Sequence, residues 1–238
     1  MDSSNDLRDL LEEYLPVISH DVRTPLTAIK GAAGILAGGL SGSISDQQAK
    51  LVDITRRNTD LATYLVQDVV DVLRLKTGLV QPCPVEFNLV TEARDVWNNI
   101  SFLTTLRTDF SAPDGEVMMV LDRHYYRRVI NALIRFPQGE KRCERVSLSI
   151  SRADSGARIS LESSPCCSDM TMLNRMLAGP VRDRRPVQGR LPVTGLELQV
   201  LKATEEAFGI LVDIQRLPED ALRIDVTWSR QEECPDTT

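Results

Sequence analysis

The sequence predicts an α+β protein in which an antiparallel helical hairpin precedes an α/β sandwich. In residues 1–78, apolar side chains recur every three or four positions, which is the period of an amphipathic α-helix. Two prolines, Pro82 and Pro84, then end the helical pattern. Beyond them, segments with helical period are interspersed with alternating segments of strand length, as expected for helices covering a sheet. These three observations indicate two domains of different architecture.

The first helix is expected to begin after an N-cap at Asp2, Ser3 or Ser4 and to end near Ala37, where a glycine-rich turn follows. Its apolar stripe consists of Leu7, Leu11, Tyr14, Ile18, Val22, Pro25, Ile29, Ala32 and Leu36. Ser45 and Gln48 form a capping box that opens a second helix, which should end near Gly78. One hairpin cannot cover both apolar stripes, so a second copy is expected to complete a dimeric four-helix bundle.

Residues 79–84 are interpreted as a linker, residues 85–230 as the second domain and residues 231–238 as a disordered tail. In the second domain, helices are expected at 88–106, 123–136, 170–177 and 196–208. Strands are expected at 108–112, 117–121, 146–151, 157–162, 210–216 and 221–228. Residues 179–192 form an Arg- and Pro-rich loop, interpreted as a solvated segment with a phosphate clamp as the alternative.

Composition excludes several classes of function. The 238 residues are 42% hydrophobic and 26% charged, with a net charge of −6, which gives no support for binding nucleic acid or an anionic membrane. No apolar run reaches the length of a membrane span. The five cysteines form no C-x-x-C pair and lie far in sequence from both histidines. Reduced thiols in a cytoplasmic protein without a metal site are therefore expected.

His20 is one of only two histidines, and it sits beside Asp21 in the middle of the first helix. It lies two residues from both Ile18 and Val22, so at about 100° per residue its side chain points about 200° away from the apolar stripe. An imidazole next to a carboxylate is therefore expected to face solvent, which is typical of a reactive side chain.

This segment resembles the phosphoacceptor box of two-component sensor histidine kinases, with matches at His20, Asp21, Arg23, Thr24, Pro25 and Leu26. The resemblance implies that His20 is the nucleophile that carries a phosphoryl group. It further implies that Asp21 orients the ring and accepts its proton, and that Thr24 serves dephosphorylation of a partner. Arg23 and Pro25 are supporting positions of the motif. The order of elements in the second domain is similar to the ATP-binding domain of the same family, so the resemblance covers about residues 5 to 230.

The sequence departs from that family where a nucleotide would bind. The helix that should carry an Asn-x-x-x-Asn-Ala-x-Lys box contains Asn131 and Arg135, but no register restores the box. No glycine follows the hairpin in residues 162–169, where the family has Asp-x-Gly-x-Gly, and no Phe-rich lid box is evident. The last glycine motif survives only around Thr194 and Gly195, with Glu197 in place of a glycine. That anion would oppose phosphate at a helix N-terminus.

The interpretation is a homodimeric histidine phosphotransferase, similar to ChpT-type proteins, that relays phosphoryl groups between response-regulator receiver domains. It predicts no cofactor or metal on this chain, with Mg²⁺ supplied by the receiver, and neither nucleic acid nor membrane as a partner. Two alternatives remain. One is a divergent ATP-dependent histidine kinase that phosphorylates His20, and the other is a non-catalytic pseudokinase interaction module.

Overall fold

The computed structural model describes residues 3–38, 42–101, 106–139, 143–154, 156–166, 168–179 and 195–229. The chain divides into two compact units, residues 1–79 and residues 80–238. No helix in these ranges is long and apolar enough to cross a membrane.

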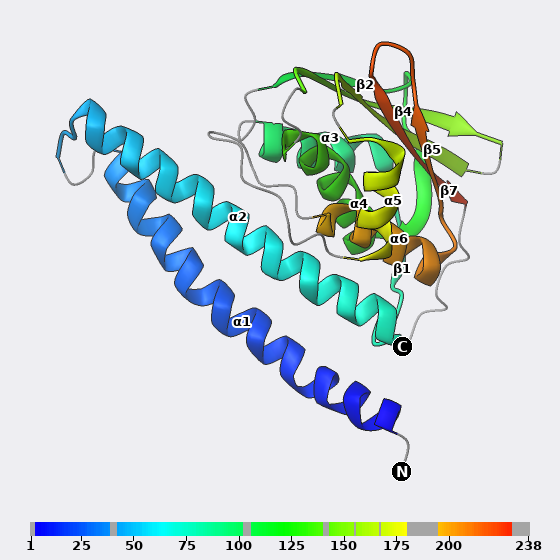
Figure 1. The fold of residues 1–238 in the computed structure, drawn as a ribbon, viewed down its shortest axis with the longest axis horizontal. Helices are drawn as coiled ribbons and strands as arrows, with labels where there is room; N and C mark the ends of the chain where they lie inside the picture. Colours follow the sequence, from blue (N-terminus) through cyan, green and yellow to red (C-terminus); the bar gives the residue numbers. More distant parts are fainter. Residues whose placement is uncertain are drawn as a thin grey trace. The chain divides into compact units, whose positions relative to one another are not determined.

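The first unit is an antiparallel hairpin of α1 (Ser3–Ala37) and α2 (Asp46–Thr77) (Figure 1). The predicted capping box is confirmed: Ser45 Oγ accepts from the Gln48 amide at 3.3 Å, and Gln48 Oε1 accepts from the Ser45 amide at 2.8 Å. The predicted end at Gly78 is also confirmed, because Gly78 is left-handed (φ 68°) and closes the last turn. Ser3 and Ser4 lie within α1 rather than before it, and Asp2 lies outside the described residues.

The buried side of α1 is displaced from the predicted stripe. Leu15, Ser19 and Ala33 are buried, whereas Tyr14 and Ile18 from the predicted stripe stay exposed. Helix α1 therefore carries two adjacent apolar stripes, and hydrophobic period alone merged them into one. Two side-chain pairs make polar contacts across the hairpin: Lys30 Nζ lies 2.6 Å from Asp60 Oδ1, and Arg23 donates to Gln67. The residue numbers of each pair add up to ninety, so both contacts belong to the same antiparallel register.

The second unit contains two sheets. The smaller pairs β1 (Pro84–Asn88) with β3 (Met118–Asp122) in antiparallel fashion. The larger has the strand order β2 (Arg107–Ser111), β4 (Arg145–Ala153), β5 (Gly156–Ser164), β7 (Leu222–Ser229), β6 (Leu211–Arg216). The β2–β4 pair is parallel, and the other pairs in this sheet are antiparallel.

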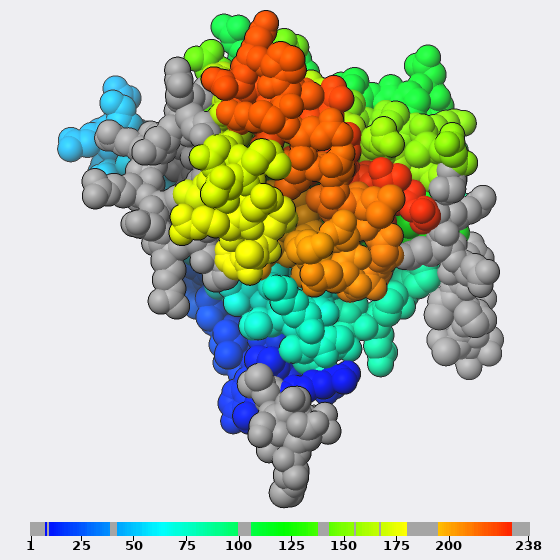
Figure 2. All heavy atoms as spheres, turned by 45° about the vertical axis from the view of Figure 1, so that its right-hand side comes forward, coloured from blue at the N-terminus to red at the C-terminus, as the bar shows by residue number. Residues whose placement is uncertain are grey.

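Helices cover one face of the larger sheet (Figure 1). They are α3 (Leu89–Ser101), α4 (Arg123–Arg135, continued by a short 3₁₀ turn at Phe136–Gly139), α5 (Met170–Ala178) and α6 (Leu196–Phe208). Figure 2 shows α5, in yellow, against α6, in orange. Alternate residues of the strands are buried, as at Ile159 and Leu161 of β5 and Ile224 of β7. Tyr126 on α4 is fully buried, and its hydroxyl donates to the Leu89 carbonyl at 2.8 Å.

The predicted α+β class is confirmed, with corrections at particular elements. Residues 84–88 form β1, although Pro84 had been assigned to the linker, because a proline is tolerated at the first residue of a strand. The helix predicted at 88–106 ends at Ser101, and β2 has begun by Arg107. The predicted tail and the predicted Arg-rich loop, apart from Gly179, lie outside the described residues.

Candidate functional site

His20 lies on the exposed surface of α1, with 79% of its side-chain surface accessible. The expectation that its ring faces solvent is confirmed for the single chain. Its Nδ1 is 3.1 Å from Asp21 Oδ1, and the Asp21 side chain is 69% exposed. A carboxylate only accepts hydrogen bonds, so this contact selects the tautomer with hydrogen on Nδ1. The Nε2 lone pair is then available to an incoming electrophile.

Pro25 interrupts the backbone hydrogen bonds of α1 close to His20. Because proline has no N–H, it cannot donate to the carbonyl four residues earlier, at Asp21. Two threonine hydroxyls on this stretch bond to carbonyls four residues before them: Thr24 Oγ1 donates to His20 O at 3.0 Å, and Thr27 Oγ1 donates to Arg23 O at 2.9 Å. The Thr24 hydroxyl hydrogen is therefore engaged with the backbone, while its oxygen can still accept a hydrogen bond.

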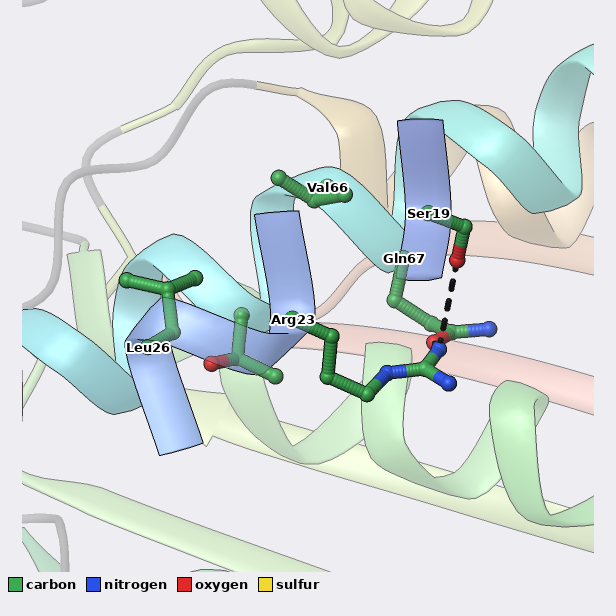
Figure 3. Close-up of a pocket in the computed structure, with 6 residues that line it drawn as sticks. Ser19, Arg23, Leu26, Val66 and Gln67 are labelled. Carbon is green, nitrogen blue, oxygen red and sulfur yellow. Dashed lines mark hydrogen bonds between the residues drawn. The ribbon is translucent and has the colours of Figure 1, made fainter. Parts of the chain in front are cut away.

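Arg23 lies at a shallow pocket between the two helices of the hairpin (Figure 3). The pocket is lined by Ser19, Arg23, Leu26, Thr63, Val66 and Gln67. Arg23 Nη2 donates to Ser19 Oγ at 3.4 Å and also to Gln67 Oε1. Sequence reasoning did not identify Gln67, because the residue is 44 positions away and belongs to no motif. Gln67 could have been identified only from the register of the hairpin, in which the residue numbers of facing positions add up to about ninety.

The residues matched to the family's nucleotide box contact one another in the second unit. Arg135 Nε donates to Asn131 Oδ1 at 2.6 Å, and Arg135 Nη1 is 3.8 Å from Glu197 Oε1. Arg135 and Glu197 are only 1% and 3% exposed. The expectation that Glu197 presents an anion at the start of α6 needs correction, because its carboxylate is buried and directed at Arg135. Thr194 lies outside the described residues.

Gly195 is the N-cap of α6, and its left-handed backbone (φ 77°) explains why glycine stands there. A Cβ at this position would lie 3.1 Å from the Met176 side chain. This glycine therefore has a packing role between α5 and α6.

The other histidine and the cysteines that the structure describes belong to the second unit. His124 packs edge-on against Tyr125, with ring centroids 5.0 Å apart. Cys143 and Cys166 are buried, whereas Cys83 is exposed. Within the part of the chain that the structure describes, no group of three or more His, Cys, Asp or Glu side chains could hold a metal ion.

Comparison with known proteins identifies a phospho-acceptor domain in the helical hairpin. Residues 10–78 match the His Kinase A (phospho-acceptor) domain. Over 216 residues the chain is 26% identical to histidine protein kinase DivJ of Caulobacter vibrioides, covering 82% of this chain and 33% of DivJ. The chain thus spans about a third of the length of that relative.

Two solved structures share the fold. Full-length ShkA in complex with AMPPNP superposes with a TM-score of 0.58 at 18% identity, covering 92% of this chain and 46% of ShkA. A bacterial phosphotransferase superposes with a TM-score of 0.51 at 12% identity, covering 91% of this chain and 95% of that protein. The chain is therefore histidine-kinase-like, with a His Kinase A phospho-acceptor domain followed by a domain that has the fold of histidine-kinase ATP-binding domains.

Proposed function

We propose that this protein is a histidine phosphotransferase that relays phosphoryl groups between response-regulator receiver domains through His20. The observation that carries the proposal is an exposed His20, bonded to Asp21 on a phospho-acceptor domain, in a chain whose Arg135 is buried against Glu197. HisKA domains dimerise and pair with response regulators, so a homodimer and receiver partners accompany the proposal.

The contacts of His20 support a balanced transfer step. Asp21 holds the hydrogen on Nδ1, so Nε2 attacks the phosphorus of an aspartyl phosphate on the receiver. The N–P bond forms as the P–O bond to the receiver's aspartate breaks, and the electron pair leaves with that carboxylate. Asp21 takes up the Nδ1 proton and so neutralises the positive charge on the ring. The same step in reverse delivers the phosphoryl group to a second receiver.

The surroundings of Arg135 support a relay that does not use ATP. In proteins of this fold family, a bound nucleotide requires a magnesium ion held by amide side chains. It also requires a cationic side chain that contacts phosphate. Asn131 instead bonds to Arg135, and Arg135 faces the buried Glu197. The neighbouring position, Ala132, is fully buried and has no ligand atom. These residues therefore do not fit a nucleotide with its magnesium ion.

A second candidate function is ATP-dependent phosphorylation of His20. The observation that favours it is the 26% identity to DivJ, a histidine protein kinase, over 82% of this chain. The shared fold does not separate the two functions, because it is common to ShkA and to the bacterial phosphotransferase.

The proposal is tested by phosphoryl transfer from receiver domains labelled with radioactive acetyl phosphate. We expect label on the wild-type chain and none on His20→Gln, because glutamine has no nucleophilic ring nitrogen. His124→Gln is the matched control, since it removes the other histidine of the chain and should leave transfer unchanged. Transfer that survives His20→Gln would overturn the proposal.

Incubation with labelled ATP and Mg²⁺, without any receiver, separates the alternatives. Label that depends on His20 in that reaction would establish the kinase function. Receiver binding with no label in either reaction would instead favour the non-catalytic interaction module.

A further inference from the structure

Gln67 of α2 is the only side chain outside α1 that is hydrogen-bonded to Arg23 among the described residues. Figure 3 shows the two side chains approaching from the two helices, with the bond from Arg23 to Ser19 dashed. Arg23 Nη2 thus has one acceptor on its own helix and one on the opposite helix. The guanidinium is held in the groove between them.

The amide of Gln67 is itself oriented. Its Nε2 donates to Asp71 Oδ1, four residues along the same helix, at 3.3 Å. The Asp71 carboxylate only accepts hydrogen bonds and the Arg23 guanidinium only donates them. The amide of Gln67 therefore has its nitrogen toward Asp71 and its oxygen toward Arg23. The chain of contacts therefore runs from Asp71 through Gln67 to Arg23.

Arg23 retains donors for a further anion. Both of its hydrogen bonds use Nη2, and within the described residues Nε and Nη1 have no hydrogen-bond partner. Arg23 is exposed and lies three residues after His20, so the two residues are neighbours on the surface of one helix. A planar guanidinium with two free donor groups matches the geometry of phosphoryl oxygens.

We infer that Gln67 is a positioning residue for phosphoryl transfer, holding the Arg23 guanidinium beside His20 so that Nε and Nη1 meet the transferring phosphoryl group. This inference rests on the proposed function and deepens it. Nε2 of His20 forms the bond to phosphorus as the bond to the receiver's aspartate oxygen breaks. The equatorial oxygens carry the charge during that exchange, and a fixed cation stabilises them without first having to be ordered.

A purely structural role for Gln67 is the competing explanation, and the chain supplies a control for it. Lys30 and Asp60 form another polar contact across the hairpin, at 2.6 Å and in the same register. Lys30 lies ten residues from His20 along α1, which is about 15 Å, and Asp60 contacts it from α2. Asp60→Asn should therefore weaken the hairpin without reaching the phosphoryl group.

The test is single-turnover transfer from a receiver domain labelled with acetyl phosphate, measured over a range of receiver concentrations. Gln67→Met keeps the length of the side chain and removes the acceptor. We expect it to lower the saturating rate about tenfold, the size expected for one charge-assisted hydrogen bond, with little change in the half-saturating receiver concentration. Asp60→Asn should leave both quantities unchanged. In an Arg23→Ala background, Gln67→Met should have no further effect, since the group it positions is gone.

Each result decides a different question. If the wild-type chain transfers and Gln67→Met transfers equally fast, the role of Gln67 is overturned and the relay stands. If Gln67→Met and Asp60→Asn slow transfer alike, or if Gln67→Met and Arg23→Ala are additive, Gln67 is structural and the inference also fails. If the wild-type chain accepts no phosphoryl group from any receiver, the proposed function itself is wrong.

Discussion

At the scale of single residues, a buried charge of the second unit is Glu92 on α3. Its side chain is 3% exposed, and its two oxygens meet Arg123, at 2.6 Å, and Arg127. Burial raises the pKa of Glu92, but hydrogen bonds from Arg123 and Arg127 together outweigh burial and hold that pKa below its ordinary value. The cluster joins α3 to α4 and so fixes the helix that carries Asn131 and Arg135.

The low pKa of Glu92 predicts how stability depends on pH. Because the pKa of Glu92 is lower in the folded chain, the folded chain binds fewer protons than the unfolded chain while Glu92 titrates. The resulting stabilisation is complete above the ordinary pKa of 4.5. It is lost as the pH falls through the lower pKa of the folded chain. We expect Glu92→Gln to reduce the free energy of unfolding by about 1–2 kcal/mol at neutral pH, and by less at about pH 3. Urea unfolding at the two pH values measures both effects. The exposed Glu86→Gln is the control, and an equal loss at both pH values would contradict this account.

At the scale of elements, the turn between β4 and β5 depends on a close approach of two strands. Gly156 begins β5 opposite Ser229 of β7, and a Cβ on Gly156 would lie 1.9 Å from the Trp228 carbonyl oxygen. That oxygen belongs to the backbone of a neighbouring strand, so it cannot move aside without breaking the pairing. The start of the hairpin therefore requires glycine.

Gly156→Ala is expected to destabilise the second unit by about 2 kcal/mol or more, because β5 and β7 must separate locally. Gly34→Ala is the contrasting variant: Gly34 lies inside α1 with nothing within 4 Å of an added Cβ, so alanine should stabilise by about 1 kcal/mol through its higher helix propensity. Thermal unfolding of both variants checks this. A Gly156→Ala chain as stable as wild type would show that the strands tolerate the extra carbon.

At the scale of the whole molecule, the hairpin exposes more apolar surface than a single copy can bury. The exposed apolar side chains are Leu10, Tyr14, Val17, Ile18, Ile29, Ile35 and Leu36 on α1 and Leu51, Ile54 and Val69 on α2. Exposed apolar side chains that recur along two long helices are typical of an interface between helices. A second copy pairing through this surface would form the expected four-helix bundle.

We expect a dimer by sedimentation velocity at micromolar concentration, and we expect Ile29→Glu to shift it toward monomer because the substitution buries a charge in the apolar interface. Gln47→Glu, at an exposed polar position in the first turn of α2, is the control and should remain dimeric. A wild-type chain that sediments as a monomer would refute pairing through this surface.

Features that depend on local chemistry could be predicted from the amino-acid sequence. The period of the apolar residues predicted both long helices and an outward-facing His20, and the capping box at Ser45 fixed the start of α2. The strands of the larger sheet were predicted to within a few residues for the same reason. Their alternation and turns are written in consecutive positions.

Contacts between side chains that are distant in sequence became known only from the folded chain. Strand β1 was missed because its pairing with β3 joins residues thirty or more positions apart. The contacts of Gln67 with Arg23, of Glu92 with Arg127 and of Arg135 with Glu197 each join two helices. A periodic pattern gives the face on which a residue lies, whereas its partner depends on the register in which two elements pack. That register is set by the burial of whole surfaces rather than by any short motif.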